Sequence, residues 1–116
     1  MSDSLTQLRD ALRAFAAERD WDQFHSPRNL ATALAVEAAE LLEPFQWLND
    51  EQSANLSPET RAAVEQEMAD VLLYLVRLAD RLDVDLVAAA RAKIVKNGEK
   101  YPVEKARGSS RKYTEI

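Results

Sequence analysis

Apolar residues recur every three or four positions along most of the chain, which is the spacing of an amphipathic helix. Leu5, Leu8, Leu12 and Phe15 form the first such stripe. No segment alternates apolar and polar residues as a strand does, and the sequence contains no repeat or low-complexity tract. The pattern predicts four helices, at about 4–19, 26–44, 57–82 and 83–97.

Local signals mark where these helices begin and end. Ser4-Leu-Thr-Gln7 fits a capping box. Ser26-Pro27 and Ser57-Pro58 each place a capping serine before a proline, which is favoured in the first turn of a helix. We expect Asp83 to cap the last helix and Asn97-Gly98 to end it.

Length and composition favour a single all-α domain. The chain has 116 residues, with only 2 glycines and 4 prolines. We expect a four-helix-bundle-like domain over 1–102 and a basic C-terminal arm over 103–116, ordered only where something holds it. The connector at 45–56 is polar apart from an aromatic pair, and we expect a loop there.

Several classes of partner are disfavoured. No apolar run approaches the ~20 residues that cross a bilayer, so we expect no membrane association. The net charge of −5 argues against a general nucleic-acid binder. The first residues lack the basic and apolar regions of a signal peptide, and the chain has no cysteine, so we expect a cytoplasmic protein.

Charge is distributed unevenly along the chain. Residues 1–92 carry a net charge of −9, and residues 93–116 carry +4. An acidic body with a basic end suits a metal ion and a polyphosphate ligand. A solvated tail that happens to be basic fits the same pattern, so charge alone leaves both interpretations open.

Two acidic pairs, Glu37-Ala-Ala-Glu40 and Glu67-Met-Ala-Asp70, fall inside helices that otherwise carry apolar rows. Residues three or four apart share a helix face, so each pair presents its carboxylates in one direction. A carboxylate facing a core is costly unless it is paired or bound to a cation. Four of them without a basic residue on the same rows favour a hard cation bound through oxygen, Mg²⁺ first. Because surface helices often carry such pairs, the alternative is a non-enzymatic helical oligomerisation module.

Other residues allow two interpretations. Glu43 is either a further member of the acidic cluster or a solvated residue of the last turn. Trp21 and Trp47 border the second helix and either plug the end of a bundle or stack on a nucleobase. His25, the single histidine, precedes a helix cap and is more often structural than catalytic in such a place.

Near the end of the fourth helix, Lys93, Asn97 and Tyr101 are spaced by four residues and can share one face. They could bind phosphates, although lysines in a last turn also complement the helix dipole. The sequence has no serine or cysteine nucleophile with a histidine partner and no Gly-rich phosphate loop. The expected nucleophile is therefore a water activated by metal.

These residues resemble the MazG-like superfamily of all-α nucleoside triphosphate pyrophosphohydrolases, whose signature is E-x-x-E followed by E-x-x-D. Within it, the chain is similar to the dCTP pyrophosphatases over nearly its whole length. The stretches that carry the resemblance are Phe15-Ala-Ala-Glu-Arg-Asp-Trp21, Phe24-His25, Pro27-Arg-Asn-Leu30, Glu37-x-x-Glu40-Leu41, Phe45-Gln-Trp47, Glu67-x-x-Asp70-Val-Leu72, Lys93, Asn97, Tyr101-Pro102 and Ser109-Ser-Arg-Lys-Tyr-Thr-Glu115.

The resemblance implies a MazG-type fold and a homotetramer with sites near the subunit contacts. The residues that it implies as ligands of Mg²⁺, for which Mn²⁺ can substitute, are Glu37, Glu40, Glu67 and Asp70. The residues that we expect to bind the substrate are Trp21 and Trp47 at the base, Lys93, Asn97 and Tyr101 at the phosphates, and His25.

One departure from the family concerns the base. Its animal members have a histidine near the base on the first helix, where this chain has Leu12. Loss of a hydrogen-bonding group removes discrimination more readily than affinity. We therefore expect looser selection of dCTP over dTTP than a dedicated hydrogen bond provides.

The predicted activity is Mg²⁺-dependent hydrolysis of dCTP, or of modified dCTP analogues, to dCMP and pyrophosphate. Its role would be to clean the nucleotide pool. Water would attack the α-phosphorus, with one of the four acids or Glu43 as general base. A broad-specificity nucleoside triphosphate pyrophosphohydrolase is the alternative among enzymes. Because apolar residues encircle the third helix, we also expect partner subunits to cover it.

Overall fold

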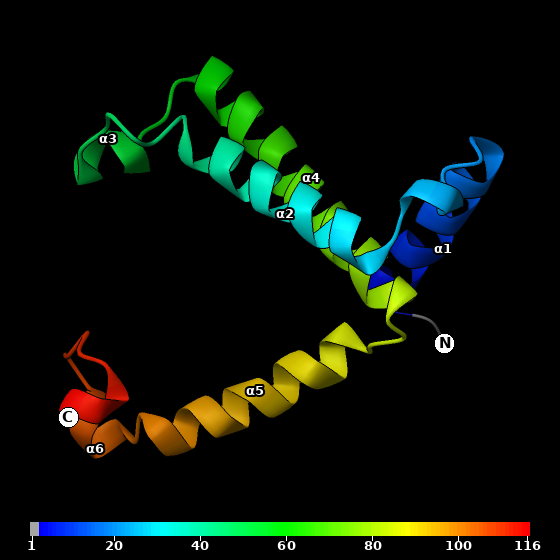
Figure 1. Ribbon diagram of the computed structural model, residues 1–116. Coiled ribbons are helices and arrows are strands. Elements are labelled where there is room, and N and C mark those ends of the chain that lie inside the picture. The colour runs from blue at the N-terminus through cyan, green and yellow to red at the C-terminus, as the bar shows by residue number, and fades with distance from the viewer. Residues whose placement is uncertain (1–2) are drawn as a thin grey trace. The chain divides into compact units, whose positions relative to one another are not determined.

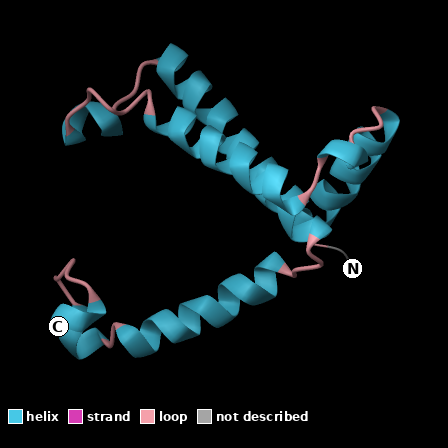
Figure 2. Cartoon of the chain, in the orientation of Figure 1, coloured by secondary structure: helices cyan, strands magenta, loops and turns pink. Residues whose placement is uncertain are grey.

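The computed structural model describes residues 3–116, and over that range it contains only helices joined by loops (Figure 2). The α-helices are α1 (Ser4–Glu18), α2 (Pro27–Leu42), α3 (Asp50–Ala54), α4 (Pro58–Arg81), α5 (Leu86–Lys100) and α6 (Val103–Ala106). Two 3-10 turns, η1 (Asp22–Phe24) and η2 (Tyr113–Glu115), complete the chain. The prediction of an all-α fold is confirmed.

The chain divides into two compact units, one ending at Val84 and one comprising Asp85–Ile116. In the first unit α2 lies alongside α4, and α1 packs against α4 (Figure 1). The second unit holds α5, α6 and η2. The boundary expected between residues 102 and 103 stays a prediction.

Both Ser-Pro signals begin helices as predicted. The Ser26 hydroxyl accepts a hydrogen bond from the Asn29 amide at 3.1 Å, and the Ser57 hydroxyl accepts one from the Thr60 amide at 3.2 Å. Each bond satisfies a first-turn amide that has no partner within the helix. The prediction for α1 was wrong by one residue, because Asp3 is its cap and accepts from the Thr6 amide at 2.7 Å.

The bounds of the fourth predicted helix also need correction. Asp83 lies in the turn after α4 with φ of 56°, and Asp85 is the residue that caps α5, accepting from the Ala88 amide at 3.0 Å. At its other end, α5 passes through Gly98 and continues to Lys100. Gly98 is not in the left-handed conformation of a C-terminal glycine, so the helix does not stop there.

The connector 45–56 is not wholly a loop, because it contains α3. The Asn49 side chain accepts from the Gln52 amide at 2.8 Å, and the Gln52 side chain accepts from the Asn49 amide at 3.0 Å. This reciprocal pair is a capping box built on Asn and Gln. Without an apolar stripe beside it, the sequence signal was too weak to predict a helix of 5 residues.

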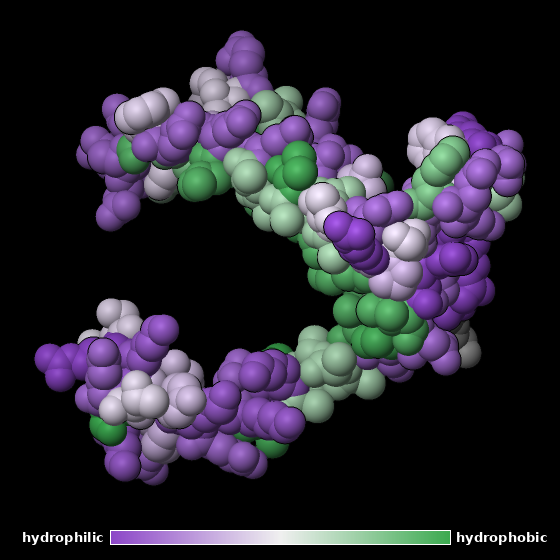
Figure 3. Space-filling view, viewed as in Figure 1, coloured by the Kyte–Doolittle hydropathy of each residue, from purple (hydrophilic) through white to green (hydrophobic). Residues whose placement is uncertain are grey.

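The core of the first unit lies between α1, α2 and α4. Leu30 of α2 and Ala16 of α1 are each 1 % exposed, and Val64 and Val76 of α4 are buried as well. Much apolar surface remains outside this core, including Val36 and Met68, and Figure 3 shows apolar residues on the surface along the α2 and α4 pair. A single chain therefore leaves its long helices incompletely covered.

No described residue of the second unit is buried. Tyr113 packs edge to face on Tyr101 with ring centroids 6.0 Å apart, so the segment after Pro102 returns to the end of α5. The Lys100 ammonium lies 5.0 Å from the centre of the Tyr113 ring. Within residues 3–116, no helix combines the length and apolar content needed to cross a bilayer.

Candidate metal centre and adjoining cavity

Three carboxylates meet where α2 and α4 pack together. Glu37 comes from α2, and Glu67 and Asp70 come from one face of α4. One oxygen from each lies within 4.8 Å of the others, and all three side chains are half-buried. Such a set of oxygens fits a hard divalent cation. The structure thus brings Glu37 together with two acids that lie 30 and 33 residues further along the chain.

Two oxygens of this cluster, Glu37 Oε2 and Glu67 Oε2, are buried without a hydrogen-bond partner. Burial raises the pKa of the Glu37 carboxyl to about 7, and the neighbouring carboxylates add to the shift because like charges oppose ionisation. A buried carboxylate oxygen with no donor is costly. A divalent cation would remove that cost, so the residues present fit a metal site.

The other acids differ in their relation to this cluster. Glu40 is half-buried and lies close enough to Glu37 to contribute to its raised pKa. Glu43 is the C-cap of α2 and is exposed. Of the four acids predicted as ligands, the structure therefore groups three directly and places Glu40 beside them. Their role as metal ligands stays a prediction.

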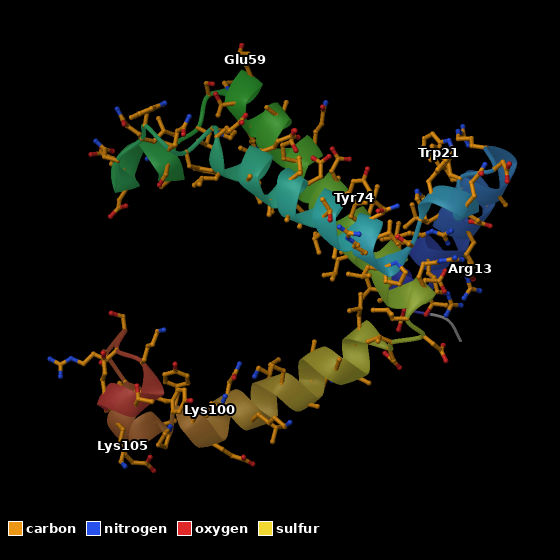
Figure 4. All side chains as sticks on the ribbon, viewed as in Figure 1. Arg13, Trp21, Glu59, Tyr74, Lys100 and Lys105 are labelled. Atoms are coloured by element: carbon orange, nitrogen blue, oxygen red, sulfur yellow. The ribbon has the colours of Figure 1, made fainter. Side chains whose placement is uncertain are left out.

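A cavity of about 360 Å³ adjoins the carboxylates. Its wall from α1 is apolar, with Leu8, Leu12 and Phe15, and its opposite wall comes from α4. Asp70 lies on this wall as well as in the carboxylate cluster. Asp70 therefore connects the cavity with the carboxylate cluster. In Figure 4, Tyr74, another lining residue, lies toward the α1 end of α4, and Glu59 marks the other end.

Trp21 is one of the aromatic residues of this cavity. Its ring is 5.7 Å from that of Phe15 and 6.1 Å from that of His25, edge to face in both pairs. The residue is 42 % exposed, so it is not sealed in the core (Figure 4). Trp47 differs: it is 86 % exposed in the loop after α2 and does not line the cavity. The structure brings Trp21 and His25 together and leaves Trp47 apart from them.

Arg77 is a residue of the cavity that sequence reasoning missed. It lies within the apolar run of α4, is 5 % exposed, and donates to the ring of His25 and to the carboxylates of Asp22 and Asp80. A charged residue inside an apolar helical run was the available signal, because burial of an arginine requires acceptors. Those acceptors could not be identified, since two of them are more than 50 residues away.

The residues predicted to reach the phosphates belong to the second unit. Lys93 and Asn97 are exposed on α5, and Tyr101 follows as its C-cap. The Tyr101 amide donates to the Asn97 carbonyl at 2.8 Å, which continues the helical spacing of the three side chains. Their contact with phosphate stays a prediction.

Comparisons with known proteins found relatives of this chain in sequence and in fold. Relatives include dCTP pyrophosphatase 1 of Homo sapiens, 50 % identical over 97 % of this chain and 68 % of the relative, and that of Bos taurus, 49 % identical over the same shares. A solved pyrophosphatase from Archaeoglobus fulgidus has a TM-score of 0.82 at 38 % identity, covering 88 % of this chain and 95 % of its own. Residues 32–116 match the MazG-like family. The chain therefore belongs to the MazG-like family, as its acidic signature indicated.

Proposed function

We propose that this protein hydrolyses dCTP, and modified dCTP analogues, to dCMP and pyrophosphate, using Mg²⁺ held by the carboxylate cluster. The observation that carries the proposal is the position of Asp70, which belongs both to the cluster and to the wall of the aromatic cavity. A base in the cavity would thereby place its triphosphate near the carboxylates. The relatives named dCTP pyrophosphatase 1 support dCTP as the substrate.

In this mechanism Glu37, Glu67 and Asp70 would hold the metal ion, with Glu40 beside them. When bound there, Mg²⁺ would lower the pKa of a water and neutralise charge on the phosphate oxygens. The apolar wall around Leu12 would exclude bulk water from the base. Attack of a water on the α-phosphorus would break its bond to the bridging oxygen of the leaving pyrophosphate, and one of the four acids or Glu43 would take the proton of the water.

The remaining binding roles are part of the same proposal. Trp21 would pack on the base within the cavity, and Trp47, exposed in the single chain, would complete the pocket at a subunit contact. Lys93, Asn97 and Tyr101 would bind the phosphate oxygens. Removal of dCTP and its analogues from the nucleotide pool implies a cytoplasmic enzyme.

The test is pyrophosphate release across a panel of deoxynucleoside and ribonucleoside triphosphates with Mg²⁺. We expect pyrimidine deoxynucleotides to have higher kcat/KM than purine ones, because the cavity adjoining Asp70 is small and mostly apolar. If dATP or dGTP has the highest kcat/KM, the alternative of a broad-specificity enzyme replaces this proposal. If no triphosphate is cleaved, the oligomerisation module is favoured.

Assembly gives a separate prediction. Ile94 and Val95 of α5 are 71 % and 64 % exposed, and a helix of 15 residues without buried side chains is marginal by itself. We expect closed assembly, as a homotetramer, to cover these side chains and the apolar surface of α4. Sedimentation equilibrium at micromolar protein should give four times the chain mass. A stable monomer at that concentration would contradict the prediction.

A further inference from the structure

Arg77 places a positive charge inside the first unit, where its side chain is 6 % exposed. A guanidinium in that position is tolerated only when its donors are satisfied. Its Nη1 donates to Asp80 at 3.4 Å, its Nη2 donates to Asp22, and its Nε donates to His25 Nδ1 at 3.1 Å. Bonds on three sides fix the plane of the guanidinium.

The carboxylate of Asp80 also accepts a hydrogen bond from Arg13 of α1. Arg13 Nε donates to Asp80 Oδ2 at 2.8 Å, and this bond is the largest cause of the lowered pKa of that carboxyl. The Asp80 carboxyl therefore stays ionised and continues to accept the hydrogen bond from Arg77. The result is a chain of charged side chains that ends at the imidazole of His25.

The bond between Arg77 and His25 determines which ring nitrogen carries the proton. A guanidinium can only donate, so Nδ1 must accept and cannot be protonated. Burial lowers the pKa of His25, and the positive charge of Arg77 lowers it further, so the ring is neutral at pH 7. The single proton of the neutral imidazole is then on Nε2.

The Nε2 donor is available to a ligand. His25 lines the cavity beside Trp21, and within the part of the chain that the structure describes its Nε2 has no hydrogen-bond partner. The neighbouring lining residues Leu12, Phe15 and Leu73 are apolar. The cavity thus combines a nearly apolar wall with an oriented N–H group, which is the arrangement that makes a small-molecule site selective.

We propose that Arg77 is a positioning residue that holds His25 as the Nε2–H tautomer, and that this N–H donates to the ring N3 of cytosine. The inference rests on the proposed function for its ligand, although the tautomer itself does not depend on substrate. Among the pyrimidines of DNA precursors, cytosine has an unprotonated N3, whereas thymine and uracil carry a hydrogen there. An N–H group on the protein would therefore meet an acceptor in dCTP and a donor in dTTP.

This proposal changes the expectation for selectivity. Leu12 lies on the cavity wall and offers no hydrogen bond, which is why looser discrimination was expected from the sequence. His25 lines the same cavity and supplies an N–H group there. We therefore expect dCTP to have a kcat/KM at least about 10-fold above that of dTTP.

The tautomer can be measured without substrate. Because the chain has one histidine, every imidazole signal in a two-dimensional ¹H–¹⁵N spectrum of the intact protein belongs to His25. At pH 7 we expect the pattern of a neutral ring protonated on Nε2. In Arg77→Gln we expect a mixture of tautomers or a protonated ring. A ring protonated on Nδ1 in the wild type, or a spectrum unchanged by Arg77→Gln, would overturn the role of Arg77.

The ratio of kcat/KM for dCTP over dTTP tests the proposed contact between His25 and cytosine. Arg77→Gln and His25→Phe should each lower the ratio of kcat/KM for dCTP over dTTP by about 10-fold, and the double variant should lower it no further. His25→Gln, whose amide can donate from a similar position, should keep more of the ratio than His25→Phe. Arg61→Gln removes an arginine of the same helix that is 72 % exposed and pairs with Glu65, away from His25, and is the matched control that should keep the wild-type ratio.

Activity measurements separate a failure of the proposed function from a failure of the proposed role of His25. If the wild type releases no pyrophosphate from dCTP, the proposed function fails and the assignment of cytosine N3 fails with it. If the wild type is active but His25→Phe keeps its preference for dCTP, the proposed function stands and the base-reading role of His25 is wrong. His25→Phe and His25→Gln also decide the matter if Arg77→Gln does not fold.

Discussion

Replacement of Glu37 by glutamine should lower kcat/KM for dCTP by at least about 10²-fold while the helical fold is kept. Loss of groups that merely support a metal ligand typically costs about 10- to 100-fold, so loss of a ligand charge should cost more. Asp70→Asn should have an effect of similar size, because Asp70 belongs to the cluster and borders the cavity. Steady-state pyrophosphate release at saturating Mg²⁺, with circular dichroism to confirm the fold, measures both.

A matched control is available on α4. Glu65 lies two residues from Glu67, but its side chain is 66 % exposed and pairs with Arg61 at 3.4 Å. Glu65→Gln removes the same charge from the same helix without touching the cluster, so it should keep nearly wild-type activity. If Glu37→Gln retains as much activity as Glu65→Gln, then Glu37 does not bind the metal.

The second large effect is on stability. Mg²⁺ that binds only the folded site should stabilise the protein by about 2.7 kcal/mol when it is ~100-fold above its dissociation constant. For a domain of this size that corresponds to a rise in Tm of about 10 °C. Glu37→Gln should gain much less from Mg²⁺, because one of the three grouped carboxylates has lost its charge. Thermal unfolding with EDTA and with millimolar Mg²⁺ measures both proteins.

The same experiment has a defined pH dependence. The folded-state pKa of Glu37 is raised from 4.5 to about 7, so the metal-free folded protein binds its proton more tightly than the unfolded chain does. Stability from this group is fully present below the unfolded value and is lost as pH rises toward about 7. In EDTA the wild-type Tm should therefore fall between pH 4.5 and 7.5. The Tm of Glu37→Gln should fall less over this pH range and should lie above the wild-type Tm at pH 8.

A wild-type Tm that does not respond to Mg²⁺ would contradict the metal site. A wild-type and a Glu37→Gln protein with the same Tm in EDTA at pH 8 would contradict the repulsion between carboxylates. Glu65→Gln again serves as the control, since an exposed acid should change neither the Tm in EDTA nor the response to Mg²⁺.

Sequence reasoning succeeded where local chemistry decides the structure. Ser26 and Ser57 begin helices because a capping hydroxyl and a following proline act within one turn. Glu37 and Glu67 could be assigned to one cluster because each interrupts an apolar row, and the packing of α2 along α4 brings the two rows together. In both cases the periodic pattern and the chemical requirement of the residue predict the same structure.

The features that were missed depend on contacts between distant segments or on competing local choices. Arg77 is held by His25 and Asp22, and nothing in the sequence pairs them with it. Asp83 and Asp85 are both acceptable caps, and the positive φ of Asp83 shows that the turn itself selects the later one. The exposure of Trp47 likewise could not be predicted, because it depends on what covers the loop after α2.

The most direct test of the account is hydrolysis of dCTP in H₂¹⁸O, with the products analysed by mass spectrometry in Mg²⁺ and in EDTA. We predict dCMP and pyrophosphate in equal amounts, with ¹⁸O in dCMP because water attacks the α-phosphorus, and no turnover in EDTA until Mg²⁺ is restored. Release of dCDP and orthophosphate, ¹⁸O in pyrophosphate, or a rate that EDTA leaves unchanged would contradict it.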